Sequence, residues 1–454
     1  MSVPRTFNGI EVWRLLVLAA ALVLAPSTAR AQDEAPIEPV MADTAAASAV
    51  TKNPTDEKYP NNFAGEFTPS KGFDIVKTER ASLNISGYGL FRWVNQTPGE
   101  QTYTDHLGRE RTVKARNDIN WHRTFVWLTG FLYDQRLRYN LSIWSLPTTQ
   151  QALVFGNLRW VTGRAMTVGV GLGPNLTARS MQGSWPFWAS SDRQMAEDFF
   201  RGGFSSTAFL TGEPIPRVYY TAAIATNLSQ LGTTASQDSR EFSYSASIWT
   251  MPTTGELGPR GGLGDLEHHV KVATRFGLSA AHAREGRYAA VEQPPVGSWI
   301  KLSDGVNPFE TGALAETVTV RELDYDEMAF DAAFKYKGFS FQGEAYVRRL
   351  SNFDATGPLP LDDVTDKGFM LQAMHMVVPR KLGLYVATGN IYDEFERDPW
   401  EVAGGASFYP FGNRSWRLNF HAIRVEKSPA NSTFGFYTAG QSGWTYSLGT
   451  DILL

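Results

Sequence analysis

Cysteine is absent from this chain of 454 residues. Its absence excludes disulfide bonds, thiolate metal sites, cysteine nucleophiles and a lipid anchor attached to cysteine. Long apolar runs are also absent, because no run after residue 31 approaches the roughly eighteen residues of a membrane-spanning helix. The formal net charge of −4 shows no basic excess, which argues against a nucleic-acid-binding protein. If the chain crosses a membrane, strands must carry it across.

The first 31 residues have the pattern of a secretory signal peptide. Two arginines supply positive charge, residues 15–25 form an apolar run, and residues 29–31 form a small-x-small cleavage site. The apolar run has about eleven residues, whereas a transmembrane anchor needs about twenty. We therefore expect the mature chain to begin near Gln32. Residues 32–62 are rich in Ala, Pro, Glu and Asp and are predicted to form a flexible periplasmic linker.

Apolar and polar side chains alternate through most of the remaining chain, in segments of about ten residues. In residues 81–95, for example, Ile85 and Trp93 share one face of a strand and Arg92 lies on the other. The apolar faces are large and aromatic, and the opposite faces are small or charged, which is the reverse of a soluble barrel with a packed interior. The predicted fold class for residues 63–454 is therefore an all-β, transmembrane antiparallel β-barrel. The alternative is a soluble sandwich, barrel or propeller.

The alternation predicts fifteen clear strands. They are residues 81–95, 118–132, 136–145, 151–161, 165–172, 215–227, 240–250, 268–279, 321–336, 339–350, 367–377, 382–391, 400–410, 416–426 and 443–454. A closed bacterial barrel with both termini on one side has an even number of strands. One more short strand is therefore predicted near residues 287–293, which gives a barrel of sixteen strands.

Residues 173–213 interrupt the alternation. This segment of about forty residues is rich in aromatic and small side chains and contains no Lys. A long interruption in a regular chain is either disordered or functional, and this composition argues against disorder. By strand count the segment is the third outer loop. We expect it to fold into the mouth of the barrel and to narrow a pore.

Several stretches resemble the phosphate-selective porin family of outer-membrane barrels, the porin O and porin P type. They are residues 72–88, 337–344, 408–419, 426–429 and 437–441. The resemblance covers roughly the whole predicted barrel and is more specific to the fold than to the solute. It implies sixteen strands, a homotrimer in the outer membrane of a Gram-negative bacterium, an inward-folded third loop and passage of anions such as phosphate. The implied partners are outer-membrane lipid and small hydrophilic or anionic solutes, with no cofactor and no nucleic acid.

An anion channel needs cationic side chains along its lumen, and the planar fork of Arg binds oxyanions with two hydrogen bonds. Strand parity predicts eight inward, pore-lining candidates. They are Arg92, Arg136, Arg138, Arg159, Arg217, Arg275, Arg348 and Arg417. For each of them the alternative is an ion pair with a lumenal carboxylate such as Glu241, Asp331 or Glu344.

The charged residues of the predicted constriction loop include both signs. They are Arg179, Asp192, Arg193, Glu197, Asp198 and Arg201, and Glu213 adds a fourth acidic group. Family members that select phosphate are expected to present Lys on this loop. Its absence therefore argues against strong phosphate selectivity and favours a general diffusion porin. Trp185, Phe187 and Trp188 either form an apolar strip for a sugar or aromatic solute, or pack the loop against the inner wall.

Two further groups could bind metal ions, and neither is predicted to do so. Glu267, His268 and His269 lie in a predicted strand, where adjacent side chains point to opposite faces. Asp324 and Asp326 share a face and could hold Ca²⁺, but a solvated strand start is the simpler interpretation. No nucleophile or zinc-protease motif is present, so the sequence predicts no catalytic residues.

The sequence thus favours a passive porin that is not an enzyme. Two other functions stay open: an outer-membrane β-barrel enzyme, and a structural barrel without an open pore. An enzyme would need a reactive Ser, His or acidic group, and a structural barrel would not conduct ions.

Overall fold

The computed structural model describes residues 72–146, 151–182, 186–228, 241–257, 262, 264–288, 291, 295, 298–430 and 435–454. Contacts divide the chain into residues 1–60 and 61–454, and every described residue belongs to the second unit. The predicted signal peptide and linker, residues 1–62, lie outside the described residues, as does Trp185.

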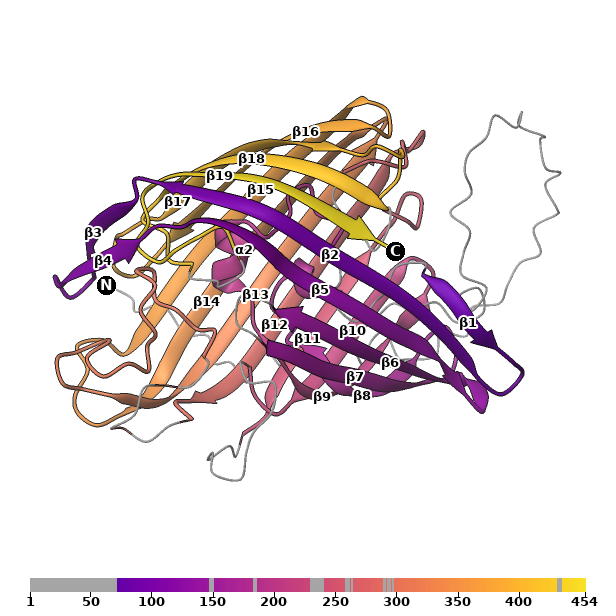
Figure 1. The fold of residues 1–454 in the computed structure, drawn as a ribbon. Helices are drawn as coiled ribbons and strands as arrows, with labels where there is room; N and C mark the ends of the chain where they lie inside the picture. Colours follow the sequence, from indigo (N-terminus) through magenta and orange to yellow (C-terminus); the bar gives the residue numbers. More distant parts are fainter. Residues whose placement is uncertain are drawn as a thin grey trace. The chain divides into compact units, whose positions relative to one another are not determined.

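Sixteen long strands of the described chain form one antiparallel sheet (Figure 1). They are β2 (Ser82–Thr97), β5 (Asn117–Leu132), β6 (Asp134–Leu146), β7 (Gln151–Val161), β8 (Thr167–Pro174), β9 (Phe204–Ile215), β10 (Val218–Ala225), β11 (Ser243–Thr250), β12 (Ala273–Gly286), β13 (Val320–Tyr336), β14 (Phe339–Ala355), β15 (Asp363–Val378), β16 (Leu382–Tyr392), β17 (Trp400–Phe408), β18 (Trp416–Glu426) and β19 (Gly443–Leu453). Each pairs with the next, and β19 pairs with β2, so the sheet closes into a barrel. The predicted fold class is confirmed.

Five shorter elements accompany the barrel. The strand β1 (Phe73–Lys77) pairs with the first half of β2. The strands β3 (Glu100–Thr104) and β4 (Glu110–Lys114) form a separate hairpin between β2 and β5. A 3₁₀ turn, η3 (Arg179–Gln182), and a short helix, α2 (Met195–Phe200), lie between β8 and β9. No helix in the described part of the chain has the length and apolar character needed to span a bilayer.

The strands alternate between a buried inner set and an exposed apolar outer set. On β13, Ala329 and Asp331 are buried, whereas Met328 and Phe330 are exposed. Large apolar side chains are exposed all around the sheet, for example Val386 with 64% of its surface accessible. So much exposed apolar surface is unfavourable in water and suits contact with lipid. A closed sheet also leaves no unpaired edge in the membrane, so the soluble alternative is excluded.

The sixteenth strand lies elsewhere than predicted. It is β9, which occupies the end of the segment 173–213 that was expected to be one irregular insert. Its alternation is weak because Ser206 and Ala208 face outward and the aromatic Phe209 faces inward. A glycine opposite makes room for this ring, since a Cβ atom on Gly169 would lie 2.1 Å from it. This accommodation across two strands cannot be read from the periodicity of β9 alone.

The strand predicted near residues 287–293 is not needed to close the barrel. β12 already runs to Gly286, and Arg287, Tyr288 and Val291 are not in a strand. The other residues of that range lie outside the described residues.

The two ends of the barrel differ in the lengths of their connections. Tight turns such as Lys337-Gly338 close one end, and longer loops leave the other. In outer-membrane barrels the short turns face the periplasm. Below, the first, third and fifth loops are residues 98–116, 175–203 and 287–319 of the outer end. The periplasmic segment is residues 251–272, an unusually long connection between β11 and β12.

Candidate functional site: a constriction inside the barrel

The third loop folds into the barrel, as predicted, because the inner wall offers it an apolar surface. Met195, Phe199 and Phe200 of α2 are buried in a cluster with inward residues of β13–β18, such as Tyr346 and Met370. The ring of Phe200 stacks on that of Tyr346 with 4.8 Å between centroids. Burying two phenylalanine side chains contributes about 2 kcal/mol each, which holds α2 against the wall (Figure 1).

Side chains of the barrel wall also accept hydrogen bonds from backbone amides of the loop. The carboxylate of Glu401 accepts a hydrogen bond from the amide of Met195 at 2.7 Å. The carboxylate of Glu344 accepts one from the amide of Arg179 at 2.7 Å. Buried backbone groups are stable only when they are paired, so these acids fix the course of the loop across the lumen.

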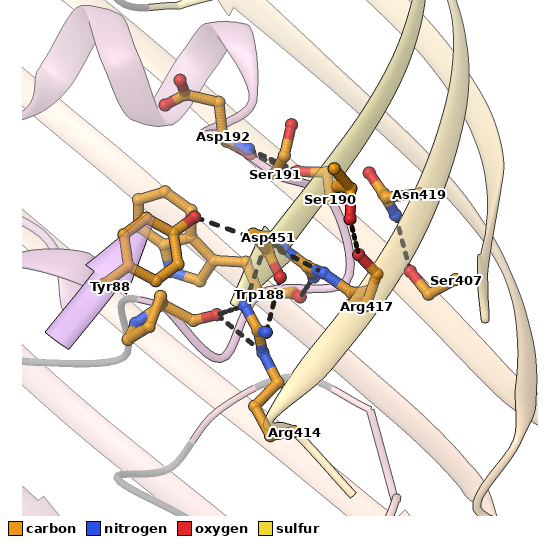
Figure 2. Close-up of polar contacts among 12 residues, drawn as sticks. Tyr88, Trp188, Ser190, Ser191, Asp192, Ser407, Arg414, Arg417, Asn419 and Asp451 are labelled. Carbon is orange, nitrogen blue, oxygen red and sulfur yellow. Dashed lines mark hydrogen bonds and ion pairs between the residues drawn. The ribbon is translucent and has the colours of Figure 1, made fainter. Parts of the chain in front are cut away.

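The tip of the loop rests on an ion cluster at the periplasmic end of β18 and β19 (Figure 2). Arg414 and Arg417 both bind Asp451, at 2.6 and 2.5 Å. Their remaining donors reach backbone carbonyls of the loop: Arg414 binds Pro186 O at 2.8 Å, and Arg417 binds Trp188 O at 2.5 Å. One carboxylate thus orients two guanidinium groups that hold the loop.

A second cluster lies where the loop meets β2 and β5. The Asp192 carboxylate binds Arg92 at 3.2 Å and Arg123 at 2.9 Å, and His122 lies 3.7 Å away. Burial alone would raise the pKa of Asp192, but the charge of Arg123, the hydrogen bond to His122 and the charge of Arg92 together lower it. Asp192 is therefore ionised, and two guanidinium groups share its single charge. This part of the constriction has a net positive charge.

The opposite end of the loop shows a related arrangement. Arg275 of β12 binds Asp331 at 2.8 Å, and the guanidinium of Arg179 lies 3.9 Å from the same carboxylate. Gln182 hydrogen bonds to Arg275 and donates to Ser247 at 2.6 Å. The third loop therefore spans the lumen from β11–β13 to β2 and β5.

Of the predicted pore-lining residues, four are buried beside a carboxylate. Arg92, Arg275, Arg348 and Arg417 pair with Asp192, Asp331, Asp366 and Asp451, respectively. Arg159 is also buried, on β7. Asp331 is one of the partners that the sequence offered as the alternative to a cationic lining. The ion-pair alternative therefore holds for each of these four arginines.

The other three predicted pore-lining residues lie at the periplasmic end. Arg136 binds Asp134 at 2.8 Å, and Arg138 donates to the carbonyl of Gln135. Arg217 was expected within a strand, but it lies in the turn before β10 and donates to Pro252 O at 2.8 Å. The expectation was wrong because β9 and β10 form a tight hairpin at this point.

The predicted constriction residues are brought together inside the barrel. Arg201 binds Asp198 at 2.8 Å, and Arg193 lies 3.7 Å from Glu197. Glu213 does not belong with them, because it lies on β9 and binds Arg164 at the periplasmic turn. The third loop therefore carries three arginines against three acids, and not against four as the sequence count had it.

Trp188 and Phe187 pack the loop against the barrel. Trp188 is buried in a cluster with Tyr88 and Phe125, and Phe187 contacts the same cluster. The guanidinium of Arg193 lies 4.7 Å from the centre of the Trp188 ring. These contacts favour the packing interpretation of the two residues over an exposed strip for solutes.

Several residues of the constriction were missed by the sequence analysis. His122 and Arg123 are consecutive, yet both are buried. The register between β2 and β5 shifts at this point, so that Leu90 pairs with Arg123 and Phe91 with Trp121. Such a bulge turns two adjacent side chains to one face, and strand parity cannot anticipate it. Arg414 was missed because it lies in a turn.

Of the first group of candidate metal residues, His269 is engaged in other contacts. Glu267, His268 and His269 lie in a turn before β12, so the strand argument used against them was wrong. Ligand atoms of Asp265, Glu267 and His269 do lie within 4.8 Å of one another. However, Asp265 already accepts hydrogen bonds from the Gly338 amide and from the amide and ring of His269. These contacts, with a hydrogen bond to Glu256, raise the pKa of His269 to about 9.

Asp324 and Asp326 are likewise partnered. They bind Arg284 and His282 at 2.9 and 2.8 Å. This agrees with the expectation that they form a polar strand start.

The outer mouth is bridged by loops from opposite sides of the ring. The first loop follows β2 and the fifth follows β12, eight strands away in either direction around the barrel. His106 of the first loop binds Asp304 of the fifth at 2.7 Å, and Arg109 donates to Gly312 O at 2.8 Å. Within the first loop, burial alone would raise the pKa of Asp105, but hydrogen bonds from Arg111 and Arg109 lower it to about 2.

Comparison with known proteins identifies the fold. No family's sequence model matches the chain, and no curated protein matches it. Among solved structures, the outer-membrane expressed OmpT of Vibrio cholerae shares 10% sequence identity, covers 84% of this chain and 100% of its own, and has a TM-score of 0.51. An anion-selective porin from Comamonas acidovorans shares 12%, over 82% of this chain and 100% of its own, with a TM-score of 0.47. The outer membrane channel DcaP of Acinetobacter baumannii shares 9%, over 84% and 99%, with a TM-score of 0.44.

At such identities the likeness to OmpT shows the fold alone. Together with the apolar exterior and the inward third loop, it makes the chain a porin-type barrel of the outer membrane of a Gram-negative bacterium. Membership of the phosphate-selective family stays a prediction.

Proposed function

We propose that this protein is a passive channel for small hydrophilic solutes, that it prefers anions, and that it carries out no catalysis. The observation that carries the proposal is the cluster in which Arg92 and Arg123 share the charge of Asp192 where the third loop crosses the lumen. A net positive charge within low-dielectric walls raises the local concentration of anions. The preference then arises at the constriction.

The remaining lumenal arginines support a modest preference. Arg348 is paired with Asp366 at 2.6 Å, and such a neutral pair attracts ions of neither sign over a distance. Arg414 and Arg417 share the single charge of Asp451, so that cluster also keeps one positive charge. The third loop also contains no Lys. We therefore propose a preference for small anions as a class, with phosphate as one of them. The homotrimer implied by the family resemblance is part of the same proposal.

The enzyme alternative is less well supported by the groups at the constriction. Ser191 and His421 lie close together, as a serine nucleophile and its base would. However, the ring Nε2 of His421 accepts a hydrogen bond from the backbone amide of Ser191 at 3.2 Å. That nitrogen is then not available to take the proton of the Ser191 hydroxyl.

The test is the single-channel current of the purified protein in a planar lipid bilayer, under a KCl gradient and then with added phosphate. Steady conductance with a reversal potential on the anion side is expected, with partial block by phosphate. Conductance without ion preference would contradict the anion proposal and leave a general porin. No conductance from folded protein, shown by heat-modifiable migration in detergent gels, would contradict the channel and favour a structural barrel.

A further inference from the structure

The periplasmic segment is far longer than the join between two neighbouring strands requires. β11 ends at Thr250 and β12 begins at Ala273, which leaves 22 residues between them. The turns between β9 and β10 and between β13 and β14 have two residues each, and two residues are enough to connect antiparallel neighbours. Below, residues 264–267 of this segment are called the inner turn.

The inner turn lies inside the barrel, against side chains that point into the lumen. Leu266 packs against a cluster that contains Met376 of β15 and Ala189 of the third loop. A Cβ atom on Gly264 would lie 2.9 Å from the sulfur of Met374, another inward residue of β15. The φ of Gly264 is 85°, a conformation that glycine favours. The inner turn thus lies on the periplasmic side of the third loop and in contact with it.

The inner turn also reaches across the barrel. A cavity of about 30 Å³ is lined by Leu266 and Glu267 and, from another side, by Tyr409 and Arg414. The last two residues lie in the turn before β18, six strands around the ring from β12. This volume has room for one or two water molecules and is too small for a hydrated ion. The third loop and the inner turn therefore narrow the lumen one after the other.

The charged contact between the inner turn and the wall is incomplete. Lys335 of β13 is 2% exposed, and its Nζ atom has no hydrogen-bond partner. Oε2 of Glu267 is also buried without one and lies 3.8 Å from that nitrogen, too far for a direct hydrogen bond. Buried charges with unfilled hydrogen-bonding capacity are unfavourable, and both groups regain water when the inner turn moves away.

The other attachments of the inner turn are fewer than those of the third loop. Asp265 accepts hydrogen bonds from the amides of Gly338 and His269 at 2.7 and 3.0 Å. Leu266 is only partly buried, whereas Phe200 of the third loop is fully buried. Elements with few buried apolar contacts open at a lower free-energy cost than well-packed ones. Of the two elements that narrow the lumen, the inner turn is therefore the one that moves more readily.

We propose that the inner turn is a gate at the periplasmic end of the lumen. When inserted, it blocks the path below the third loop, and when it moves out toward the periplasm it opens that path. Its withdrawal also exposes Lys335 to the lumen, which adds a positive charge to the path of an anion. The inference deepens the proposed function and rests on it, because a gate has a role only in a barrel that conducts ions.

The first test weakens the inserted state. Leu266→Ser removes the apolar contact of the inner turn, and the measurement is the single-channel current of the full-length protein in a planar bilayer in KCl. The ratio of open to closed times is expected to rise about tenfold, because the lost leucine side chain stabilises the inserted state alone. Val270→Ser is the matched control, since Val270 belongs to the same segment and is 74% exposed. An unchanged ratio in Leu266→Ser, shown to be folded by heat-modifiable migration, would contradict the gate.

The second test fixes the gate in its inserted position. The chain contains no cysteine, so Leu266→Cys combined with Met376→Cys introduces the only two thiols. Both positions line the same small cavity, and a short bis-methanethiosulfonate reagent is expected to link them. The linked protein should lose most of its conductance, and dithiothreitol should restore it. Each single variant treated with the same reagent is the control. Conductance that does not change in protein shown by mass spectrometry to be linked would overturn the proposal.

The outcomes separate the gate from the channel. If the wild-type protein conducts, and neither Leu266→Ser nor the link changes its current, the channel is retained and the gate is lost. If no folded form conducts, including Leu266→Ser, the proposed function itself is contradicted, and the gate with it.

Discussion

Two sides of the barrel lumen differ in what their inward side chains do. On the loop-bearing wall, β13–β19, these side chains include Met370 and Ile391 in the cluster around α2, and Asp451 in the ion cluster under the loop tip. On the hydroxyl wall, β9–β12, they are mostly small and polar. The inward Ser and Thr residues there are Ser205, Thr207, Thr211, Thr221, Ser243, Ser245, Ser247 and Ser279.

The outward faces of the two walls are alike, because both face lipid. The inward faces differ in how they hold the third loop. The loop-bearing wall packs apolar side chains against α2, whereas Ser247 and Ser279 of the hydroxyl wall accept hydrogen bonds from Gln182. The lumen is therefore specialised by sector: one wall holds the third loop mainly by apolar packing and buried ion pairs, and the other mainly through hydroxyl groups.

The largest expected effect on the loop-bearing wall comes from Asp451→Asn. It removes the carboxylate that Arg414 and Arg417 share, and breaking a buried ion pair costs about 3–5 kcal/mol. The urea midpoint for loss of heat-modifiable migration should fall. Glu322→Gln is the control, because its partner Arg284 is near the surface and such pairs contribute about 0–1 kcal/mol. Equal midpoints for the two variants would contradict the assignment of Asp451.

Phe200→Ala should release the third loop from the loop-bearing wall. Removing a buried phenylalanine ring costs about 3 kcal/mol in a packed cluster, and here it also abolishes the stack on Tyr346. We expect larger current fluctuations and faster proteolysis of the loop, with the barrel still folded. Ser245→Ala on the hydroxyl wall should change neither, since it removes no contact to the loop. Similar fluctuations in both variants would show that the two walls do not differ in this way.

Removing a negative charge and removing positive charges at the constriction should shift the ion preference of the channel in opposite directions. Asp192→Asn leaves Arg92 and Arg123 without their shared carboxylate and should shift the reversal potential further to the anion side. Arg92→Gln combined with Arg123→Gln should shift it toward the cation side. The measurement is the reversal potential under a KCl gradient. Shifts of the same sign in both would contradict a charge effect.

The smallest effect concerns the periplasmic segment and its dependence on pH. The pKa of His269 is raised to about 9, chiefly by hydrogen bonds to Asp265 and Glu256. A raised folded-state pKa stabilises the segment fully below the usual histidine value of about 6.5 and loses this contribution as the pH rises through about 9. Limited proteolysis of residues 251–272 should therefore be faster at pH 10 than at pH 7. His269→Gln should remove most of this difference, and a difference that persists would point to another group.

Most of the barrel could be predicted because alternation is a local signal. Membrane strands must show lipid an apolar face, so their positions repeat in the sequence. The alternation did not predict β9, because Ser206 and Ala208 make its outer face less apolar and Phe209 points inward. It failed again at His122, where a bulge turns two neighbours to one side. Both failures occur where a strand adapts to its neighbour or to the third loop.

The sequence by itself determined the number and type of strands, the closed barrel that follows from lipid contact, and the position of a long third loop. The tertiary structure alone decided which carboxylate each arginine meets. Asp192 lies 100 positions from Arg92 and Asp451 lies 34 from Arg417, and no local pattern links them. Net charge at a constriction is a property of such pairs, because paired charges cancel and unpaired ones attract. For this reason the composition of the loop alone could not predict the charge at the constriction.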